Sequence, residues 1–293
     1  MRVLVLGGTG SIGSAVLSEF LAAGHDVLAL ARSERSATLM EARGAKILRG
    51  DIRNPAGWVL SVPEIDAVIH AATDFSNQMD AIDRRLLDAL LPMLGAMPRR
   101  VRLVYTGGCW LYGETGARIA TETTPFDPLP AFEWSVPTIG RVLAAPEIDA
   151  LIIHPAMVYT HDGGVFSSFV EDARTGGPIT IVGGEHVHWP LVHADDLAVL
   201  YRLALERGVA GASYNGAAVA GLLVGSIVRS IARRFGLAAP ELRTVRANTI
   251  AAEKGEWARG YALDQRMSGD KARRELGWRP AHGDPLRELA EPG

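Results

Sequence analysis

The sequence predicts an α/β protein built on a doubly wound parallel sheet, with a smaller lobe toward the C-terminus. Two observations carry this prediction. Short apolar runs alternate with helical patterns from the first residues onward, and each run is nearly continuous in Val, Leu, Ile or Ala. A continuously apolar strand is buried on both faces, which is typical of a parallel sheet covered by helices.

The predicted elements follow one another as strand, helix and strand. The apolar runs that we expect to form strands span 3–6, 27–30, 45–48, 67–69, 102–105 and 151–154. The helical patterns between the first three span 14–23 and 35–43, and a later one covers 195–207. We therefore expect a core over 1–160, completed by about 189–217, and a smaller lobe over 161–188 and 218–293 that closes a cleft.

The composition excludes several classes of protein. The chain has 293 residues, 48% of them hydrophobic, a net charge of -3 and one cysteine. A chain of this length buries enough surface for a full core without metals or disulfides. Because no long basic run occurs, we expect no nucleic acid and no membrane surface as a partner. The N-terminal apolar stretch is too short for a signal peptide, so we expect a cytoplasmic protein.

One uncharged segment, 208–228, is long enough to span a membrane. It contains five glycines, and its pattern changes from β-like at 212–215 to helical from Leu222 onward. We therefore expect a strand, a turn and a helix there, not a membrane span.

A glycine-rich loop lies between the first predicted strand and the first predicted helix. Two spacings overlap in it, because either Gly7 or Gly8 combines with Gly10 and Gly13. Both spacings predict a dinucleotide site, in which glycines allow the backbone to approach a pyrophosphate at the helix N-terminus. The expected contacts of this loop are Gly7, Thr9, Gly10, Ser11, Ile12 and Gly13.

The spacing Gly7-x-x-Gly10-x-x-Gly13 resembles that of the extended short-chain dehydrogenase/reductase family, which includes NAD-dependent epimerases and dehydratases. The resemblance continues at 192–198, 214–215 and 270–280. It implies a Rossmann domain that binds NAD(P) and a C-terminal lobe that binds a small-molecule substrate. Asp195, before the helical pattern, is expected to be the N-cap of that helix, and His193 to be a packing or hydrogen-bonding residue.

The end of the second strand bears on the choice of cofactor. An NAD site would offer Asp or Glu to the ribose there, whereas this chain has Arg32 and Ser33. An arginine pairs with a 2′-phosphate, so we expect NADP; NAD remains the alternative if Arg32 is only a solvated charge. The resemblance and the strand ends imply the remaining cofactor contacts, which are Asp51, Ile52, Ala71, Ala72, Thr73, Thr106, Arg141 and Pro155.

The catalytic pattern of the family is missing. The family uses a Tyr with a Lys four residues later, and a Ser or Thr upstream of them. In the best register Pro137 and Arg141 take the places of the pair, and Gly108 takes the place of the hydroxyl. Because no lysine lies between Lys46 and Lys254, no other register restores the pair. The resemblance is therefore to an atypical branch.

Three hydroxyls near the expected cleft are candidates for the catalytic role. Tyr112 and Tyr159 are candidates for the acid, and Thr106 is a candidate for orienting a carbonyl group. Each has a plainer interpretation, as a packing tyrosine or a hydroxyl at a strand end. Arg141 would hold a ribose or a phosphate, since its pKa is too high for it to donate a proton.

The sequence thus predicts an NADP-dependent oxidoreductase or epimerase/dehydratase-like enzyme that acts on a small carbonyl or sugar-type substrate with a non-standard proton relay. The alternative is an NADP-binding sensor without turnover. No metal site is expected, because His186 and His188 lack a nearby third ligand. The sequence does not give the oligomeric state, although a homodimer is compatible with it.

Overall fold

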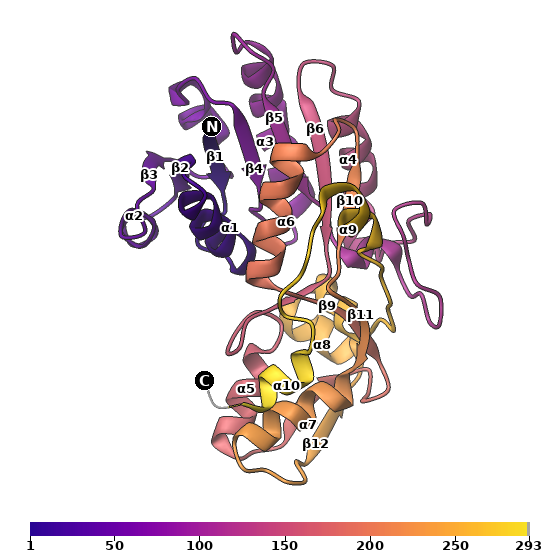
Figure 1. Cartoon of the computed structure of the whole chain (residues 1–293). Helices are drawn as coiled ribbons and strands as arrows, with labels where there is room; N and C mark the ends of the chain where they lie inside the picture. The colour runs from indigo at the N-terminus through magenta and orange to yellow at the C-terminus, as the bar shows by residue number, and fades with distance from the viewer. Residues whose placement is uncertain (292–293) are drawn as a thin grey trace.

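The largest feature of the computed structural model, which describes residues 1–291, is one sheet of seven strands. These strands are β1 (Arg2–Leu6), β2 (Asp26–Ala31), β3 (Lys46–Arg49), β4 (Ala67–His70), β5 (Arg102–Thr106), β6 (Asp149–Pro155) and β10 (Ser213–Gly216). Their order across the sheet is β10-β6-β5-β4-β1-β2-β3, and every neighbouring pair is parallel. The predicted doubly wound α/β fold is confirmed (Figure 1).

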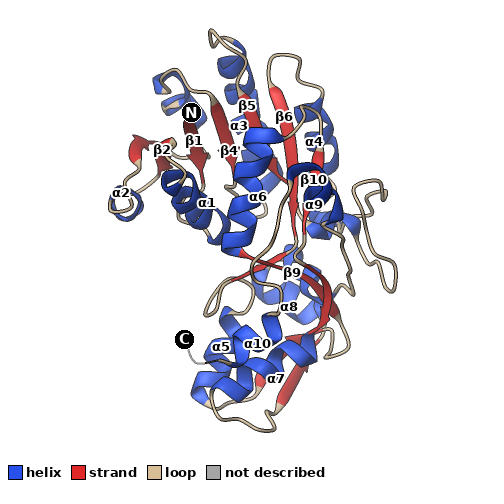
Figure 2. Cartoon of the chain, in the orientation of Figure 1, coloured by secondary structure: helices blue, strands red, loops and turns tan. Residues whose placement is uncertain are grey.

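Helices cover both faces of this sheet (Figure 2). The helices are α1 (Ser11–Ala22), α2 (Glu34–Glu41) and α6 (Ala194–Arg207) on one face, and α3 (Met79–Gly95) and α4 (Ser135–Leu143) on the other. Successive residues of β1 enter different cores, since Val3 and Val5 pack on the α1 side whereas Leu4 and Leu6 pack on the α3 side. This burial on both faces explains why the strands are continuously apolar.

The C-terminal lobe is built around two smaller sheets. Its strands are β7 (Met157–Tyr159), β9 (His188–His193) and β11 (Val219–Leu223) in one sheet, and β8 (Ile179–Val182) and β12 (Leu242–Val245) in the other. Its helices are α5 (Ser167–Thr175), α7 (Val224–Arg234), α8 (Ala247–Lys254) and α10 (Pro285–Ala290). The remaining helix, α9 (Asp270–Leu276), returns to the large sheet and packs near β10 and α6.

Two of the segments that carry the family resemblance fasten the C-terminal segment to α6. The indole of Trp278 donates a hydrogen bond to the Asp196 carbonyl at 2.8 Å. The Asp196 carboxylate accepts the backbone N–H groups of Ala281 at 2.7 Å and His282 at 3.0 Å. The buried indole bond and the two charge-assisted bonds to the carboxylate give the two segments a structural role.

Most predicted elements of the core are present, and the differences lie at boundaries. Helix α1 begins at Ser11, three residues before the predicted start. The segment 208–228 contains β10, the strand β11 and the start of α7, so the predicted strand and helix are present, with a second strand between them. Strand β11 is only partly buried and contains Gly221, which weakens a strand pattern. Within residues 1–291, no helix has the length and apolar character needed to cross a membrane.

Candidate cofactor and substrate cleft

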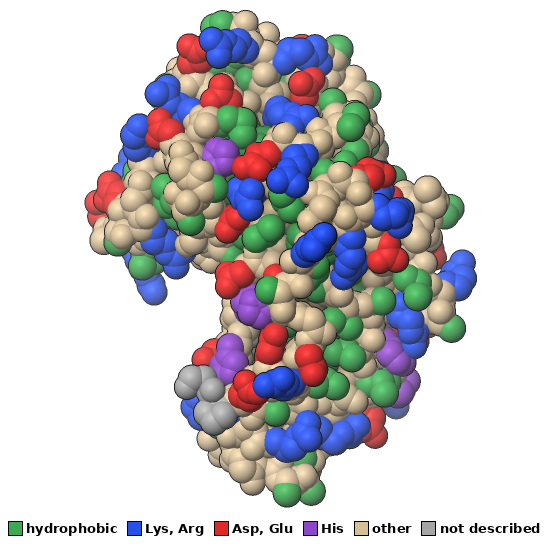
Figure 3. Space-filling model, in the orientation of Figure 1, with side chains coloured by type: hydrophobic (Ala, Val, Ile, Leu, Met, Phe, Trp, Pro, Cys, Tyr) green, Lys and Arg blue, Asp and Glu red, His purple; other side chains and the backbone are tan. Residues whose placement is uncertain are grey.

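A cleft of about 730 Å³ follows the carboxyl ends of the parallel strands. Its lining comes from the large sheet, from residues near β7 and from the C-terminal lobe, and the space-filling view is hollowed between the two lobes (Figure 3). Strand order reverses between β1 and β4, because the chain leads to β2 on one side and to β4 on the other. Ligands of doubly wound sheets bind at such a switch point.

The glycine-rich loop forms the floor of the cleft at this point. Gly7 has a φ of 91°, and a Cβ built on it would lie 2.6 Å from the Ala71 carbonyl oxygen. A Cβ on Gly13 would lie 2.1 Å from the carbonyl oxygen of Gly7, so Gly13 packs the helix against the loop. In contrast, a Cβ on Gly8 would meet the flexible end of the Met40 side chain at 2.7 Å. The geometry favours the spacing that begins at Gly7.

The N-terminus of α1 opens onto the cleft. Its N-cap residue, Gly10, provides no side-chain hydrogen bond, so backbone N–H groups of the first turn are free for a ligand. Thr9, Ser11 and Ile12 line the cleft around it. An uncapped helix N-terminus, with its positive dipole end, is suited to a pyrophosphate.

Arg32 lines the cleft at the end of β2, and its side chain is exposed. Within residues 1–291 no ion pair engages this guanidinium, in contrast with Arg49, which pairs with Glu34 at 2.8 Å. Asp51 lines the cleft beside it. Ser33, the neighbouring prediction, instead caps α2 by accepting the Ser36 N–H at 3.2 Å, which leaves it outside the lining.

Most of the predicted cofactor contacts share this cleft. The lining includes Gly7, Thr9, Gly10, Ser11, Ile12, Arg32, Asp51, Ile52, Ala71, Ala72, Thr73, Thr106 and Pro155. Gly13 and Ser33 are outside it for the reasons given above. Arg141 is also outside it, because it lies on the solvent side of α4 and pairs with Asp88 at 2.7 Å. The structure therefore does not bring Arg141 to a position where it could hold a ribose.

The two tyrosines predicted as acids do not reach the cleft. Tyr112 is buried, and its hydroxyl donates a hydrogen bond to Asn215 Oδ1 at 2.8 Å. Tyr159 is buried on β7, and its hydroxyl donates to Glu288 Oε2 at 3.3 Å. Burial raises the pKa of both phenols above the ordinary value. Both side chains have the packing role that was their plainer interpretation, and we do not retain them as acids.

Thr106 is the predicted hydroxyl that does line the cleft, at the end of β5. Its Oγ1 lies 2.6 Å from the hydroxyl oxygen of Tyr201, which extends from α6 behind it. Tyr201 is fully buried, and burial raises its pKa above the ordinary value. This pair joins β5 to α6, whereas Pro137 and Arg141, at the places of the family's Tyr and Lys, lie on α4 on the other face of the sheet. Gly108, at the usual Ser or Thr position, also lines the cleft and offers no side chain.

A second polar network in the lining was missed by sequence reasoning. The His70 Nε2 lies 2.8 Å from Asp83 Oδ1, and the Tyr105 hydroxyl donates to Asp83 Oδ2 at 2.8 Å. All three side chains are buried. The sequence does contain a signal for this network. His70 ends one apolar strand and Tyr105 lies near the end of another, while Asp83 lies among the apolar residues of the helix α3.

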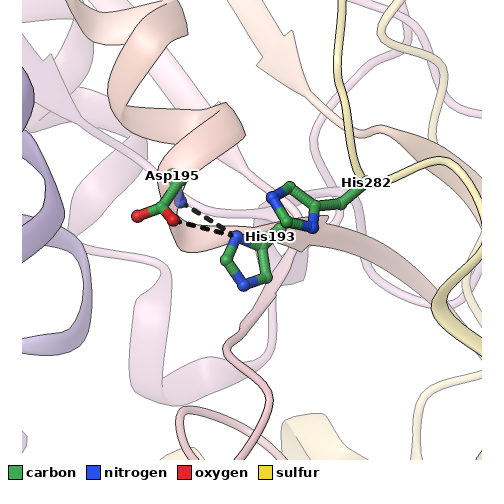
Figure 4. Close-up of side chains that lie close together, drawn as sticks. All are labelled: His193, Asp195 and His282. Atoms are coloured by element: carbon green, nitrogen blue, oxygen red, sulfur yellow. Dashed lines mark hydrogen bonds and ion pairs between the residues drawn. The ribbon is translucent and has the colours of Figure 1, made fainter. Parts of the chain in front are cut away.

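One group of three possible metal ligands occurs among the described residues, outside this cleft: His193, Asp195 and His282 (Figure 4). The two imidazoles are stacked with centroids 3.7 Å apart and planes at 21°. The lone pairs of stacked rings point in parallel and do not converge on an ion about 2 Å from each nitrogen. This geometry carries no metal site, and the expected absence of a metal stays a prediction.

The same group corrects one interpretation. Asp195 was expected to be the N-cap of the helix, but α6 begins at Ala194 with His193 as its N-cap. The His193 Nδ1 accepts the backbone N–H of Asp195 at 3.3 Å, which is the hydrogen-bonding role expected of His193 (Figure 4). Burial, and then the neighbouring His282, lower the pKa of His193, which keeps the ring a neutral acceptor.

Comparison with known proteins adds to this geometry. The family model described as the NAD dependent epimerase/dehydratase family matches residues 3–217. An uncharacterized protein of Saccharomyces cerevisiae, YLL056C, is 30% identical over 303 residues, which cover 99% of this chain and 98% of that protein.

Two solved structures have a similar fold. The human epimerase family protein SDR39U1 (isoform 2), solved with NADPH, has a TM-score of 0.82 at 19% identity and covers 99% of this chain and 98% of its own. The UDP-glucose 4-epimerase of Thermus thermophilus, in complex with NAD, has a TM-score of 0.80 at 23% identity and covers 99% and 97%.

Proposed function

The chain belongs to the NAD dependent epimerase/dehydratase family, and from that premise we propose that it is an NADP-dependent oxidoreductase that reduces a carbonyl group of a small molecule. One observation carries the proposal. A single cleft joins the uncapped N-terminus of α1 and the unpaired Arg32 to the Thr106 hydroxyl. It therefore offers anion sites at one end and a hydrogen-bond donor at the other.

The residues of the cofactor end suit a dinucleotide. The loop at Gly7 packs directly against the backbone of Ala71, so a side chain on Gly7 would push the loop away from the sheet. Because the loop stays close to the sheet, room remains for a pyrophosphate at the N-terminus of the helix. Arg32 would hold a 2′-phosphate by charge-assisted hydrogen bonds. Of the two similar structures, the human protein was solved with NADPH and the bacterial epimerase with NAD, so the preference for NADP depends on Arg32.

The chemistry needs one hydride and one proton. The carbonyl carbon would take the hydride that a bound reduced nicotinamide can supply, and the carbonyl group would become an alcohol. Thr106 donates its proton to the carbonyl oxygen, and Tyr201 replaces that proton across their 2.6 Å contact. When the product leaves, a proton from solvent in the cleft returns to Tyr201 through the Thr106 hydroxyl, because Tyr201 itself is buried. Because Tyr201 has a raised pKa, we expect kcat to show no phenol ionisation between about pH 7 and about pH 9.

Calorimetry with NADPH and NADH tests the cofactor. We expect NADPH to bind more tightly, and Arg32→Ala to remove most of the difference, about 1–3 kcal/mol. Arg35→Ala is the matched control, since Arg35 is exposed on the same helix end but outside the cleft lining. Equal affinities of the wild type for the two cofactors would contradict the assignment of NADP.

Turnover tests the relay. Thr106→Val keeps the shape of the side chain and removes its hydroxyl, so we expect kcat to fall about 100-fold with little change in NADPH affinity. Tyr201→Phe should lower kcat in the same direction by removing the second hydroxyl. An unchanged kcat in Thr106→Val would exclude this relay. NADPH binding without oxidation by any carbonyl compound would instead favour the sensor.

A further inference from the structure

The end of the cleft beyond Thr106 is walled by aromatic rings. We call Phe75, Trp110, Phe132, Trp257 and Tyr261 the aromatic wall; four of them line the main cleft, and Trp257 lines a hollow that adjoins it. Ring centroids are 5.4 Å apart for Trp110 and Tyr261 and 6.3 Å apart for the stacked indoles of Trp110 and Trp257. Rings from both lobes thus form one continuous apolar surface.

Phe75 completes this wall at an energetic cost to its backbone. It is the described non-glycine residue with a positive φ, 50°, a conformation that costs a bulky residue about 1–2 kcal/mol. The residue is 46% exposed, and its ring centroid lies 4.9 Å from that of Trp257. A strained backbone that holds an apolar ring open to the cleft is typical of a ligand contact.

Cationic side chains are distributed unevenly along the lining of the cleft. Arg32, at the cofactor end, is the cation of the cleft lining, and no Lys or Arg among the described residues lines the part beyond Thr106. The lining of the adjoining hollow includes two carboxylates, Asp80 and Glu256, and no Lys or Arg; their partners, Arg84 at 3.5 Å and Arg259 at 2.6 Å, are outside that lining. A nucleotide sugar carries a diphosphate, which proteins bind with cations or with several N–H donors. Such a substrate would meet carboxylates and rings here.

We propose that the substrate is an uncharged aromatic aldehyde or ketone, stacked on the aromatic wall with its carbonyl oxygen at Thr106. This inference rests on the proposed function and names its substrate class. In the reaction, the carbonyl carbon gains a hydride as NADPH is oxidised to NADP⁺, and the oxygen takes the Thr106 proton. The product is the corresponding primary or secondary alcohol.

A panel of matched compounds tests the substrate class. NADPH oxidation is followed at fixed enzyme with 2-naphthaldehyde, benzaldehyde and 4-carboxybenzaldehyde, and conversion of UDP-glucose is followed by chromatography. We expect 2-naphthaldehyde to have the lowest KM, and 4-carboxybenzaldehyde to have a KM at least 10-fold higher than benzaldehyde. Each aldehyde is also titrated against the tryptophan fluorescence of the protein, which reports binding at the wall without turnover.

Two pairs of variants locate the binding. Phe75→Ala should raise the KM for 2-naphthaldehyde about 5- to 10-fold with kcat little changed, because one stacking ring is lost. Leu60→Ala, which removes an exposed apolar side chain outside the cleft, should leave it unchanged. Glu256→Arg should lower the KM for 4-carboxybenzaldehyde at least 3-fold. Glu253→Arg is its control, because Glu253 is exposed on α8 and lines neither space.

The outcomes separate this inference from the proposed function. Conversion of UDP-glucose, or a carboxylated aldehyde as good as benzaldehyde, would overturn the substrate class and leave a nicotinamide-dependent enzyme. NADPH binding with neither quenching nor oxidation by any aldehyde would also overturn it. Failure of NADPH to bind in calorimetry would instead remove the proposed function itself.

Discussion

The two halves of the cleft are built from different parts of the chain. In the cofactor half, backbone atoms set the shape, since Gly7 and Gly13 pack within distances that exclude any Cβ. In the substrate half, side chains set the shape, as rings from both lobes meet around Trp110. Where glycine backbone forms the surface, as at Gly7 and Gly13, no other residue fits. Where side chains form the surface, substitutions can change its chemistry while the fold stays the same.

We expect the largest effect from adding a methyl group to a glycine of the cofactor half. Gly7→Ala places a Cβ 2.6 Å from the Ala71 carbonyl and keeps a φ of 91°, so we expect a loss of more than about 4 kcal/mol of stability and no measurable NADPH binding. Urea unfolding and calorimetry would measure the two effects.

The control for this change is Gly24→Ala. Gly24 also has a positive φ, 80°, but a Cβ there would meet nothing within 4 Å. We expect a cost of about 1 kcal/mol and normal NADPH binding, because only the backbone conformation is disfavoured. If both alanines cost the same, the close packing at Gly7 is not what shapes this half.

We expect an effect of intermediate size on stability from His154, a buried residue that packs beneath the substrate half of the cleft. A Cβ on Gly107 would lie 2.4 Å from the His154 Nδ1, and neither ring nitrogen has a hydrogen-bond partner among the described residues. Burial lowers the pKa of His154 from 6.5 to about 4. Between these values the unfolded chain binds more protons, so stability falls as the pH drops from about 6.5 to about 4, by about 3 kcal/mol.

Unfolding free energies measured from pH 7 to pH 4 would show this loss. His154→Phe replaces the imidazole with a ring that cannot titrate, beside Tyr112 and Phe126, and should remove the share of the acid loss that His154 causes, while His193, whose pKa is also lowered, keeps its own share. His186→Ala, which removes an exposed histidine, should leave the acid loss as it is in the wild type. A wild-type curve that is flat down to pH 4.5 would contradict a neutral, buried His154.

More of the cofactor half than of the substrate half could be predicted from the sequence. The glycines of the turn and Arg32 were predicted to lie at the ends of the first two strands, and most of them line the cleft there, while the phosphate contact of Arg32 stays a prediction. Tyr201 could not be predicted, because it lies 95 residues from Thr106 in the sequence and meets it only through the packing of α6. The tyrosines chosen as acids failed for a related reason: closeness in sequence to a strand end does not say which face a hydroxyl occupies.

The smallest effects are expected at Tyr112 and Tyr159, which lie beneath the substrate half. Tyr112→Phe leaves the buried Asn215 Oδ1 without its donor, so we expect a loss of about 1–2 kcal/mol of stability. Tyr159→Phe removes a longer bond, 3.3 Å, to the half-exposed Glu288 and should cost less than about 1 kcal/mol.

Neither substitution should change kcat more than about 2-fold, since neither hydroxyl faces the cleft. Unfolding curves and steady-state rates at a temperature well below both transitions would separate stability from catalysis. A tenfold drop in kcat in either variant, with the fold intact, would mean that a buried tyrosine passes a proton to the cleft. The Thr106–Tyr201 pair would then not be the sole relay. Proton transfer in the substrate half would also need a buried hydroxyl that does not line the cleft.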